Sequence, residues 1–232
     1  MQVTQYRLPP TALMPNSPYP LLHYRGLEIE PKASKFYDLF SQNGWRVQWI
    51  YRYGETQRSH YHSSAHECMV VLSGTATIRF GVGDTSLDMD DNTYGPAREQ
   101  GGVEIEARPG DVFLLPAGTA HKTYNTSPRA DFTLLSPGDG HGIDAQDPRA
   151  ALDQVPLSGF TMLGAYPEGS SSWDSLKGGE KNFDEFRSVW TVPKPERDPV
   201  LDTSPQGLMG LWPDVDIDLQ TAEAPQRLRS RL

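Results

Sequence analysis

Short apolar segments separated by turn residues fill the middle of this sequence, from Trp45 to about Tyr166. In one of them, Ala76, Ile78 and Phe80 alternate with polar residues, as in a strand with one buried face. Segments of this kind, mostly bounded by Gly, Pro, Asn or Asp, are RVQWIYRY, CMVVLSG, TATIRFG, VEIEA, DVFLLP, HKTYN, ADFTLL and GFTMLGAY. Many short strands joined by turns indicate an all-β sandwich or barrel.

Two stretches interrupt these strands. Residues 82–102 are acidic and glycine-rich, and we expect a loop there. Residues 136–158 separate the last two strands, and Asp147 followed by Pro148 favours the start of a helical turn.

The N-terminal residues 1–44 are expected to form an arm beside a barrel core of residues 45–166. Prolines break the arm, LLHYRG offers one strand, and a short amphipathic helix is predicted between Pro31 and Gly44.

The C-terminal residues 167–232 are expected to contain a helix and a wrapping tail. Phe183, Phe186 and Trp190 are spaced for one helix face, and GLMGLW is interpreted as a last strand. Because no second core is visible, we expect residues 1–232 to form a single domain.

Composition and charge narrow the functional classes. The chain is 37% hydrophobic and 22% charged, as in soluble globular proteins, and its net charge of −9 disfavours a nucleic-acid partner. We expect no membrane association, because no apolar run is long enough to cross a bilayer and MQVTQYRLPP does not resemble a signal peptide. Cys68 is the single cysteine, which favours a reducing compartment such as the cytoplasm. Alternatively, Ser230-Arg231-Leu232 resembles a peroxisomal address, although a chance tripeptide is an equally good interpretation.

Three of the six histidines fall within HYHSSAHE, residues 60–67. On a strand, His60 and His62 would project from the same face, and a bend would return Glu67 to the same place. His121 opens a later strand and supplies a fourth candidate ligand. Neutral imidazoles together with a carboxylate suit a divalent transition metal and leave coordination positions for other molecules.

The histidine-rich segment and a second stretch, residues 110–125, complete a paired pattern. It reads G-x5-H-x-H-x4-E-x6-G and G-x5-P-x-G-x2-H-x3-N, and every fixed position is filled. Because it carries this paired pattern, the chain resembles the cupin superfamily. PNSPYPLLHYRG, FYDLFSQNGW and LGAYPEG are similar to the YjlB-like cupins in particular. The resemblance extends to about residue 212 and lapses in 82–102, in 136–158 and in the C-terminal tail.

The resemblance implies a double-stranded β-helix, a jelly-roll barrel with one metal inside it. It implies that His60, His62, Glu67 and His121 bind that metal, which in family members is Mn, Fe, Ni, Zn, Co or Cu. It also points to a homodimer, in which the extended N-terminal segment would add a strand to the partner's sheet. It implies no single reaction, because cupins include dioxygenases, decarboxylases, isomerases and non-catalytic binding proteins.

Other residues near the ligands are open to two interpretations. Trp49, Tyr51 and Arg52 are candidate substrate-binding residues, with Arg52 on the opposite face from the two aromatics; alternatively, the aromatics are core and Arg52 pairs with a surface carboxylate. His66 is expected to point away from Glu67 and not to be a ligand. Tyr61 and Cys68 are expected to be packing residues. His23 and His141 carry no signal alone, although His141 would cap the pocket if 136–158 folded over the barrel mouth.

From the pattern and the resemblance we expect a metal-dependent cupin enzyme. It would act on a small oxygenated molecule, as a dioxygenase, decarboxylase or isomerase. Glu67 would be a ligand that also takes a proton. The alternative is a non-catalytic module that binds a small molecule or a metal. A purely structural dimer scaffold would not explain four intact ligands.

Overall fold

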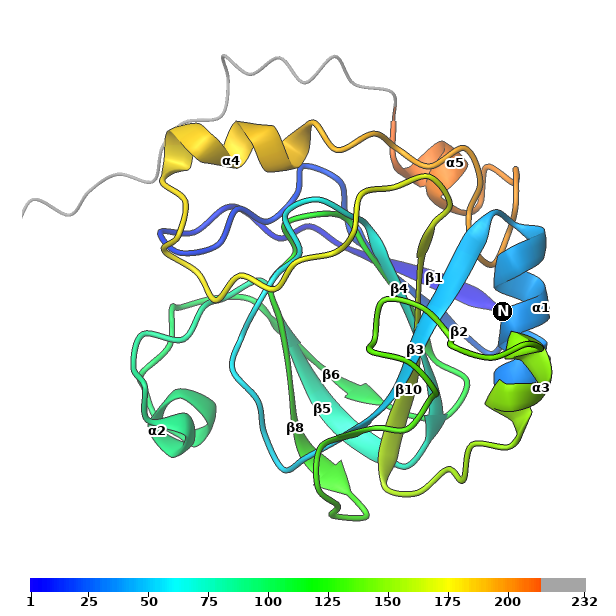
Figure 1. The fold of residues 1–232 in the computed structure, drawn as a ribbon. Coiled ribbons are helices and arrows are strands. Elements are labelled where there is room, and N and C mark those ends of the chain that lie inside the picture. Colours follow the sequence, from blue (N-terminus) through cyan, green and yellow to red (C-terminus); the bar gives the residue numbers. More distant parts are fainter. Residues whose placement is uncertain (214–232) are drawn as a thin grey trace, which may run out of the picture.

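The computed structural model describes residues 1–213 and contains two antiparallel β-sheets that face each other (Figure 1). Within these residues the large sheet has the strand order β1-β2-β7-β4-β10-β3-β9, and the small sheet has the order β6-β5-β8. The large sheet comprises β1 (Gln2–Tyr6), β2 (Leu21–Arg25), β7 (Val112–Leu115), β4 (Glu67–Ser73), β10 (Phe160–Pro167), β3 (Trp45–Tyr53) and β9 (Thr133–Leu134). The small sheet comprises β6 (Val103–Ala107), β5 (Thr75–Phe80) and β8 (His121–Ser127). This jelly roll confirms the expected all-β fold class.

Buried side chains form two apolar layers on either side of the large sheet. On β4, Met69 and Val71 point between the sheets, whereas Cys68 and Val70 point to the outer face. The alternation expected for β5 is confirmed, because its apolar side chains fill the barrel interior and Arg79 on the other face pairs with Glu104. The interior face therefore carries the side chains that can meet inside the barrel.

A β-bulge in β3 changes which side chains face the interior. Val47 pairs with Ala165 and Trp49 pairs with Gly164, so Gln48 is the extra residue. Val47 consequently packs in the outer layer, whereas Trp49 packs in the interior. In a regular strand these two residues would share one face.

Five helices lie outside the sheets of the described chain: α1 (Ala33–Gln42), α2 (Met89–Tyr94), α3 (Pro148–Asp153), α4 (Phe183–Trp190) and α5 (Leu208–Leu211). Figure 1 shows α1 and α3 together beside the large sheet, and α4 over one end of the barrel. The helix predicted between Pro31 and Gly44 is confirmed as α1, and the turn after Asp147 is confirmed as α3, which Asp147 caps. The helix predicted from the Phe183 spacing is α4.

Three expectations about local structure are wrong. GLMGLW forms α5 and not a strand, since Leu208 and Trp212 pack on the outer layer of the large sheet. Residues 82–102 are not only a loop but contain α2, whose first turn is capped by the Asp88 carboxylate. Of ADFTLL, only Thr133 and Leu134 pair as a strand.

The N-terminal arm is bound tightly to the barrel of its own chain. β1 pairs with β2 over five residue pairs, so it completes one edge of the large sheet. Farther along, the buried side chain of Asn16 donates to the carbonyl oxygens of Pro9 and Gly81 and accepts from the backbone N–H of Ala120. The arm thereby holds the residue that precedes His121.

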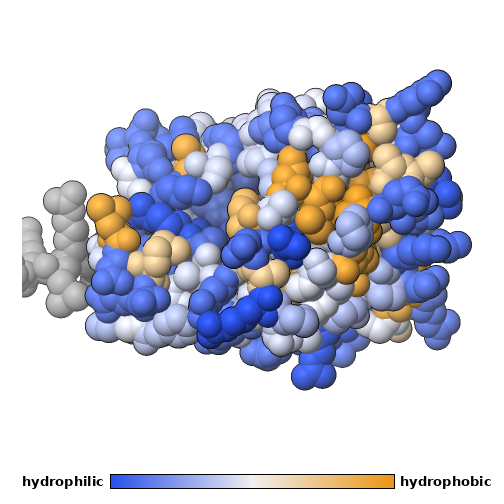
Figure 2. Space-filling view, turned by 60° about the horizontal axis from the view of Figure 1, so that its bottom comes forward, coloured by the Kyte–Doolittle hydropathy of each residue, from blue (hydrophilic) through white to orange (hydrophobic). Residues whose placement is uncertain are grey.

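The surface is mostly polar. On the face shown in Figure 2, apolar side chains gather in one patch surrounded by hydrophilic ones. Among the described residues, no helix is long and apolar enough to span a membrane. The tripeptide Ser230-Arg231-Leu232 lies outside the described residues.

Candidate metal centre

Four side chains from three parts of the chain converge inside the barrel. His60 and His62 lie on an extended segment between β3 and β4, not on a regular strand as expected. The backbone of His60 exchanges two hydrogen bonds with that of His121 at the start of β8, at 3.1 and 2.8 Å. Glu67 opens β4 and shares the interior face with Met69 and Val71. The backbone pairing, rather than proximity in sequence, brings His121 to the other two histidines.

The side-chain atoms are close enough to share one ion. One ring nitrogen from each of His60, His62 and His121 lies within 4.8 Å of the others. Glu67 completes the group, with Oε1 3.2 Å from Nε2 of His62 and Oε2 3.5 Å from Nε2 of His121. Glu67 Oε2 is buried and has no hydrogen-bond partner among residues 1–213. The donor set thus fits a divalent transition metal, and the unpartnered carboxylate oxygen favours a cation at this position.

Backbone carbonyls fix which nitrogen of each imidazole carries a proton. Nδ1 of His60 lies 3.2 Å from the carbonyl oxygen of Arg58, and Nδ1 of His121 lies 3.1 Å from that of Thr119. Nδ1 of His62 contacts the carbonyl oxygen of Asp174. A carbonyl only accepts, so in each neutral ring Nδ1 donates and Nε2 keeps a free lone pair. His60 and His121 therefore present the tautomer that a metal requires, whereas Nε2 of His62 also lies 3.2 Å from an acceptor, Glu67 Oε1.

Burial and mutual repulsion keep two of these rings neutral. Burial lowers the pKa of His60 well below its ordinary value, and His121 and His62 lower it further. Burial likewise lowers the pKa of His121 to about 4, against the opposing attraction of Glu67. His62 differs: burial lowers its pKa, but the Glu67 carboxylate outweighs burial and the net pKa is raised. Neutral imidazoles are the form that binds a metal.

Glu67 is held as a carboxylate despite its burial. Burial raises its pKa, but His62, His121 and a hydrogen bond from Tyr166 together lower it to about 2. The Tyr166 hydroxyl donates to Glu67 Oε1 at 2.5 Å and accepts from Nε1 of Trp49 at 3.1 Å. This chain of three side chains orients the carboxylate toward the histidines.

Comparison with known proteins identifies the family. Residues 51–151, which include all four converging side chains, match the family described as Cupin. Residues 51–151 therefore form a cupin domain. The chain is also 28% identical over 134 residues to "Uncharacterized protein YjlB" of Bacillus subtilis (strain 168), an alignment that covers 56% of this chain and 66% of the relative. This confirms the resemblance to YjlB-like cupins, and the match spans slightly less than two thirds of the curated relative's length.

Two solved structures share a weaker likeness with this chain. Vicilin from Capsicum annuum matches with a TM-score of 0.32 and 13% identity, over 74% of this chain and 33% of that chain. Procruciferin, the 11S globulin of Brassica napus, matches with a TM-score of 0.31 and 11% identity, over 76% of this chain and 34% of that chain. The strand pairing described above, and not this weak likeness, defines the fold.

A cavity of about 260 Å³ opens beside the four side chains of this cupin. Its walls include all four of them together with Trp49, Tyr51, Tyr53, Gln57, Arg58, Phe132, Tyr166, Trp173, Ser175 and Lys177. Trp49 and Tyr51, two of the candidate substrate-binding residues, thus line the cavity. Arg52 does not: its guanidinium bonds to the carbonyl of Asp131 and to two hydroxyl groups outside the cavity.

The loop after β10 supplies several cavity residues that sequence reasoning did not find. The backbone of Leu176 pairs with that of Tyr61, which brings Trp173 and Lys177 to the cavity. The Asp174 carboxylate accepts from the backbone N–H and the hydroxyl of Ser63. Only the aromatic and basic character of this loop in the sequence could have drawn attention to it.

The remaining histidines and packing residues have clear positions. His66 points away from Glu67 to the outer face, where its Nδ1 accepts from the N–H of Ala117 and its ring lies 5.1 Å from that of Trp212. Tyr61 and Cys68 are fully buried, as expected. His141 is stacked on Trp173 at 4.3 Å between ring centroids, so residues 136–158 do reach the loop that borders the cavity.

Proposed function

We propose that this cupin binds one divalent transition-metal ion, such as Mn, Fe, Ni or Zn, through His60, His62, Glu67 and His121. We further propose that it is an enzyme acting on a small oxygenated molecule, of dioxygenase, decarboxylase or isomerase type. The observation that supports this best is the convergence of ring nitrogens from three histidines, two of which lie within 3.5 Å of the buried Glu67 carboxylate. A bound metal would supply Lewis acidity.

The chain's own groups provide the rest of the chemistry. Glu67 is ionised and borders the cavity, so its carboxylate can accept a proton from a substrate C–H or O–H group. Tyr166 holds that carboxylate by a hydrogen bond, and burial together with the nearby Glu67 charge raises the pKa of Tyr166 well above its ordinary value. Tyr166 is therefore a positioning residue that keeps its own proton.

Metal analysis tests the first part of the proposal. Protein purified without a metal-affinity tag, from cells supplied with Mn, Fe, Ni and Zn, should contain close to one equivalent of one of them. His62→Ala should lose most of this metal and keep its fold, because the interior layer is apolar without it. Less than about a tenth of an equivalent in the wild-type protein would overturn the metal site.

Glu67→Gln tests the enzymatic part. The amide oxygen can still bind a metal but is a poor base, so turnover should fall about a hundredfold or more while some metal remains. The activity is sought by oxygen uptake and mass spectrometry with a panel of hydroxy acids, enediols and phenols. Equal turnover of the variant and the wild type would remove Glu67 from the mechanism. Metal-loaded protein that binds these compounds but transforms none would favour a binding module.

We also propose that residues 1–232 form a single domain and that the protein is a homodimer. β1 pairs within its own chain, and its outer edge has no strand partner among residues 1–213. An unpaired edge is the kind of surface to which a second copy adds. Light scattering that gives the 25.8 kDa mass of one chain at micromolar concentration would contradict the dimer.

A further inference from the structure

The cavity beside the histidines has polar groups that the proposed metal site leaves unused. Nε of Arg58 and Nε2 of Gln57 are both buried, and neither has a hydrogen-bond partner among the described residues. Both side chains line the cavity. Buried donors without partners are rare in folded proteins, because each is destabilising if no acceptor satisfies it. Two such donors on one cavity wall indicate a bound acceptor.

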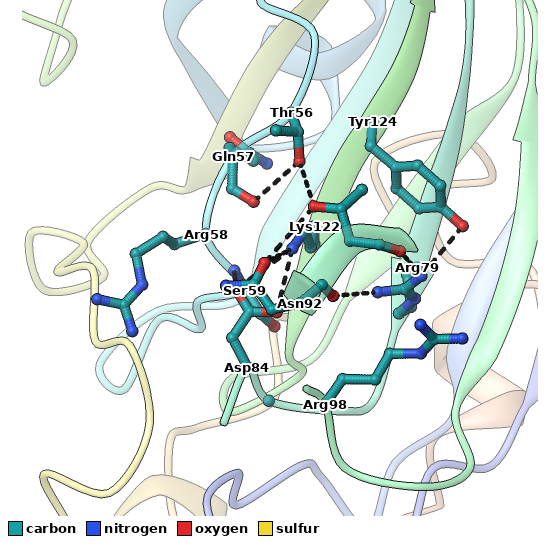
Figure 3. A network of polar contacts seen from close by, with 12 residues as sticks. Thr56, Gln57, Arg58, Ser59, Arg79, Asp84, Asn92, Arg98, Lys122 and Tyr124 are labelled. Atoms are coloured by element: carbon teal, nitrogen blue, oxygen red, sulfur yellow. Dashed lines mark hydrogen bonds and ion pairs between the residues drawn. The ribbon is translucent and has the colours of Figure 1, made fainter. Parts of the chain in front are cut away.

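Figure 3 shows that the Arg58 side chain takes no part in the polar network beside it. Its neighbour Ser59 joins a polar network with Asp84, whereas the Arg58 side chain extends away from that network and no interaction is drawn to it. No ion pair of Arg58 is found in the part of the chain that the structure describes. Its guanidinium is therefore available to a ligand in the cavity.

A second cation, Lys177, borders the same cavity. Its ammonium group donates to the Ser175 hydroxyl at 2.8 Å, which leaves further donors for a ligand. Burial lowers the pKa of Lys177, and the positive charge of Arg58 lowers it further, so the two cations are electrostatically close. The nearby Glu180 carboxylate attracts Lys177 and opposes these two effects, and it accepts from the backbone N–H groups of Lys177 and Gly178, both at 2.6 Å.

The balance of charge at the cavity is opposite to that of the whole molecule. The chain has a net charge of −9, yet two cations adjoin a site that would also hold a divalent metal. Holding like charges together at a partly buried wall is unfavourable unless an anion neutralises them. An anionic ligand would satisfy the free donors and the excess charge at once.

The size and the other walls narrow the ligand further. A volume of 260 Å³ holds on the order of nine water molecules, so only a small organic molecule fits. Flat rings also line the cavity, including Tyr51 and Phe132, which are stacked at 5.1 Å, and Trp173. Such walls bind an apolar or aromatic body.

We propose that this cavity binds small monocarboxylates with an apolar or aromatic body, whose carboxylate is bound by Arg58, Gln57 and Lys177. The proposal rests on the proposed function, because it places the ligand beside the four metal-binding side chains. The carboxylate accepts from the guanidinium, the amide and the ammonium group, and the ring or chain of the ligand packs on the aromatic walls.

Binding of benzoate and of benzamide, its uncharged analogue of nearly the same shape, tests the proposal directly. Titrations are followed by calorimetry and by the fluorescence of Trp49 and Trp173, so no turnover is needed. Benzoate should bind at least about tenfold more tightly than benzamide, because hydrogen bonds to a charged group are stronger than those to a neutral one. Arg58→Gln and Lys177→Gln should each weaken benzoate binding about tenfold or more, and should leave benzamide binding nearly unchanged.

Matched variants and metal analysis separate the two proposals. Arg46→Gln on β3 and Lys35→Gln on α1 remove exposed cations outside the cavity and should leave benzoate binding unchanged. Metal content is measured on every variant, and Arg58→Gln and Lys177→Gln should retain the wild-type value. Any one of three results would overturn the carboxylate site. These are equal binding of benzoate and benzamide, no binding of benzoate, acetate or lactate at millimolar concentrations, and tighter binding of inorganic phosphate than of benzoate. Loss of metal from the wild-type protein alone would instead overturn the proposed function.

Discussion

The Asp84 carboxylate lies 3.1 Å from the ammonium nitrogen of Lys122, and the two side chains are only 2% and 0% exposed. Asp84 also accepts a hydrogen bond of 2.9 Å from the backbone N–H of Ser59, the residue before His60. Lys122 follows His121 in β8. This buried ion pair therefore ties the segment that carries His60 to the strand that carries His121 (Figure 3).

Asp84→Asn should be strongly destabilising. The substitution keeps the shape of the side chain but leaves the buried Lys122 charge without its partner, which costs about 3–5 kcal/mol. The free energy of unfolding in urea measures this loss. Asp84→Asn combined with Lys122→Met should recover much of it, because no buried charge is then left unpaired. If Asp84→Asn were as mild as Glu28→Gln at the surface, the ion pair would not support the site.

Tyr166→Phe should weaken metal binding without unfolding the protein. The change removes only the hydroxyl that donates to Glu67 at 2.5 Å, so the carboxylate loses its fixed orientation. Loss of such a supporting hydrogen bond lowers metal affinity about 10- to 100-fold. Competition titration with a chromogenic chelator measures the affinity. Tyr94→Phe removes a hydroxyl from an exposed tyrosine that bonds to Asn125, and it should leave the affinity unchanged.

Acid should destabilise the metal-free protein partly through His66. Burial lowers the pKa of His66 to about 4 from its ordinary 6.5. The neutral ring accepts a hydrogen bond at Nδ1 from the backbone N–H of Ala117. Between pH 6.5 and pH 4 the unfolded chain takes up a proton that the folded chain does not, so stability falls as pH falls through this window. The contribution of His66 is on the order of 3 kcal/mol.

His66→Gln should therefore flatten the stability profile in that window. Urea unfolding with a chelator present, at several values of pH, gives the slope for the variant and for the wild type. His141→Gln, at an exposed histidine, serves as the control. Parallel profiles for His66→Gln and the wild type would show that His66 is protonated equally in the folded and unfolded states.

Gly164→Ala should disturb the cavity through Trp49. A Cβ at Gly164 would lie 2.1 Å from two carbons of the Trp49 indole, so the ring must move and its bond to Tyr166 must lengthen. Overpacking of this kind costs about 1–3 kcal/mol. Gly142→Ala meets nothing within 4 Å and is the matched control. Thermal unfolding measures the loss of stability, and tryptophan fluorescence measures the displacement of the Trp49 ring. A wild-type emission spectrum for Gly164→Ala would count against this displacement.

The sequence predicted the four converging side chains because the two motifs that carry them match a known family pattern at every fixed position. Tyr166 could not be predicted in the same way, since it lies 99 residues from Glu67 and meets it only through the pairing of β10 with β4. Trp173 and Lys177 reach the cavity through the pairing of Leu176 with Tyr61, which no periodic pattern indicates.

The prediction of a strand in GLMGLW failed for a related reason. A short apolar run fits a buried strand and a buried helix equally well, and tertiary contacts decide between them. Here Trp212 is anchored by its Nε1 to the carbonyl of Pro20, and its ring stacks on Tyr19 at 5.1 Å between centroids. Both partners belong to the distant N-terminal arm.

The position of β10 in the large sheet has a consequence for biosynthesis. It is the last strand within residues 1–213, yet it lies between β4 and β3, which are otherwise unpaired with each other. While the ribosome is still making the first 159 residues, these two strands have no shared partner, and the carbonyl of Asp174 that orients His62 does not yet exist. We therefore expect nascent chains stalled before β10 to be protease-sensitive and to acquire metal only after release, as pulse-labelling with limited proteolysis would show.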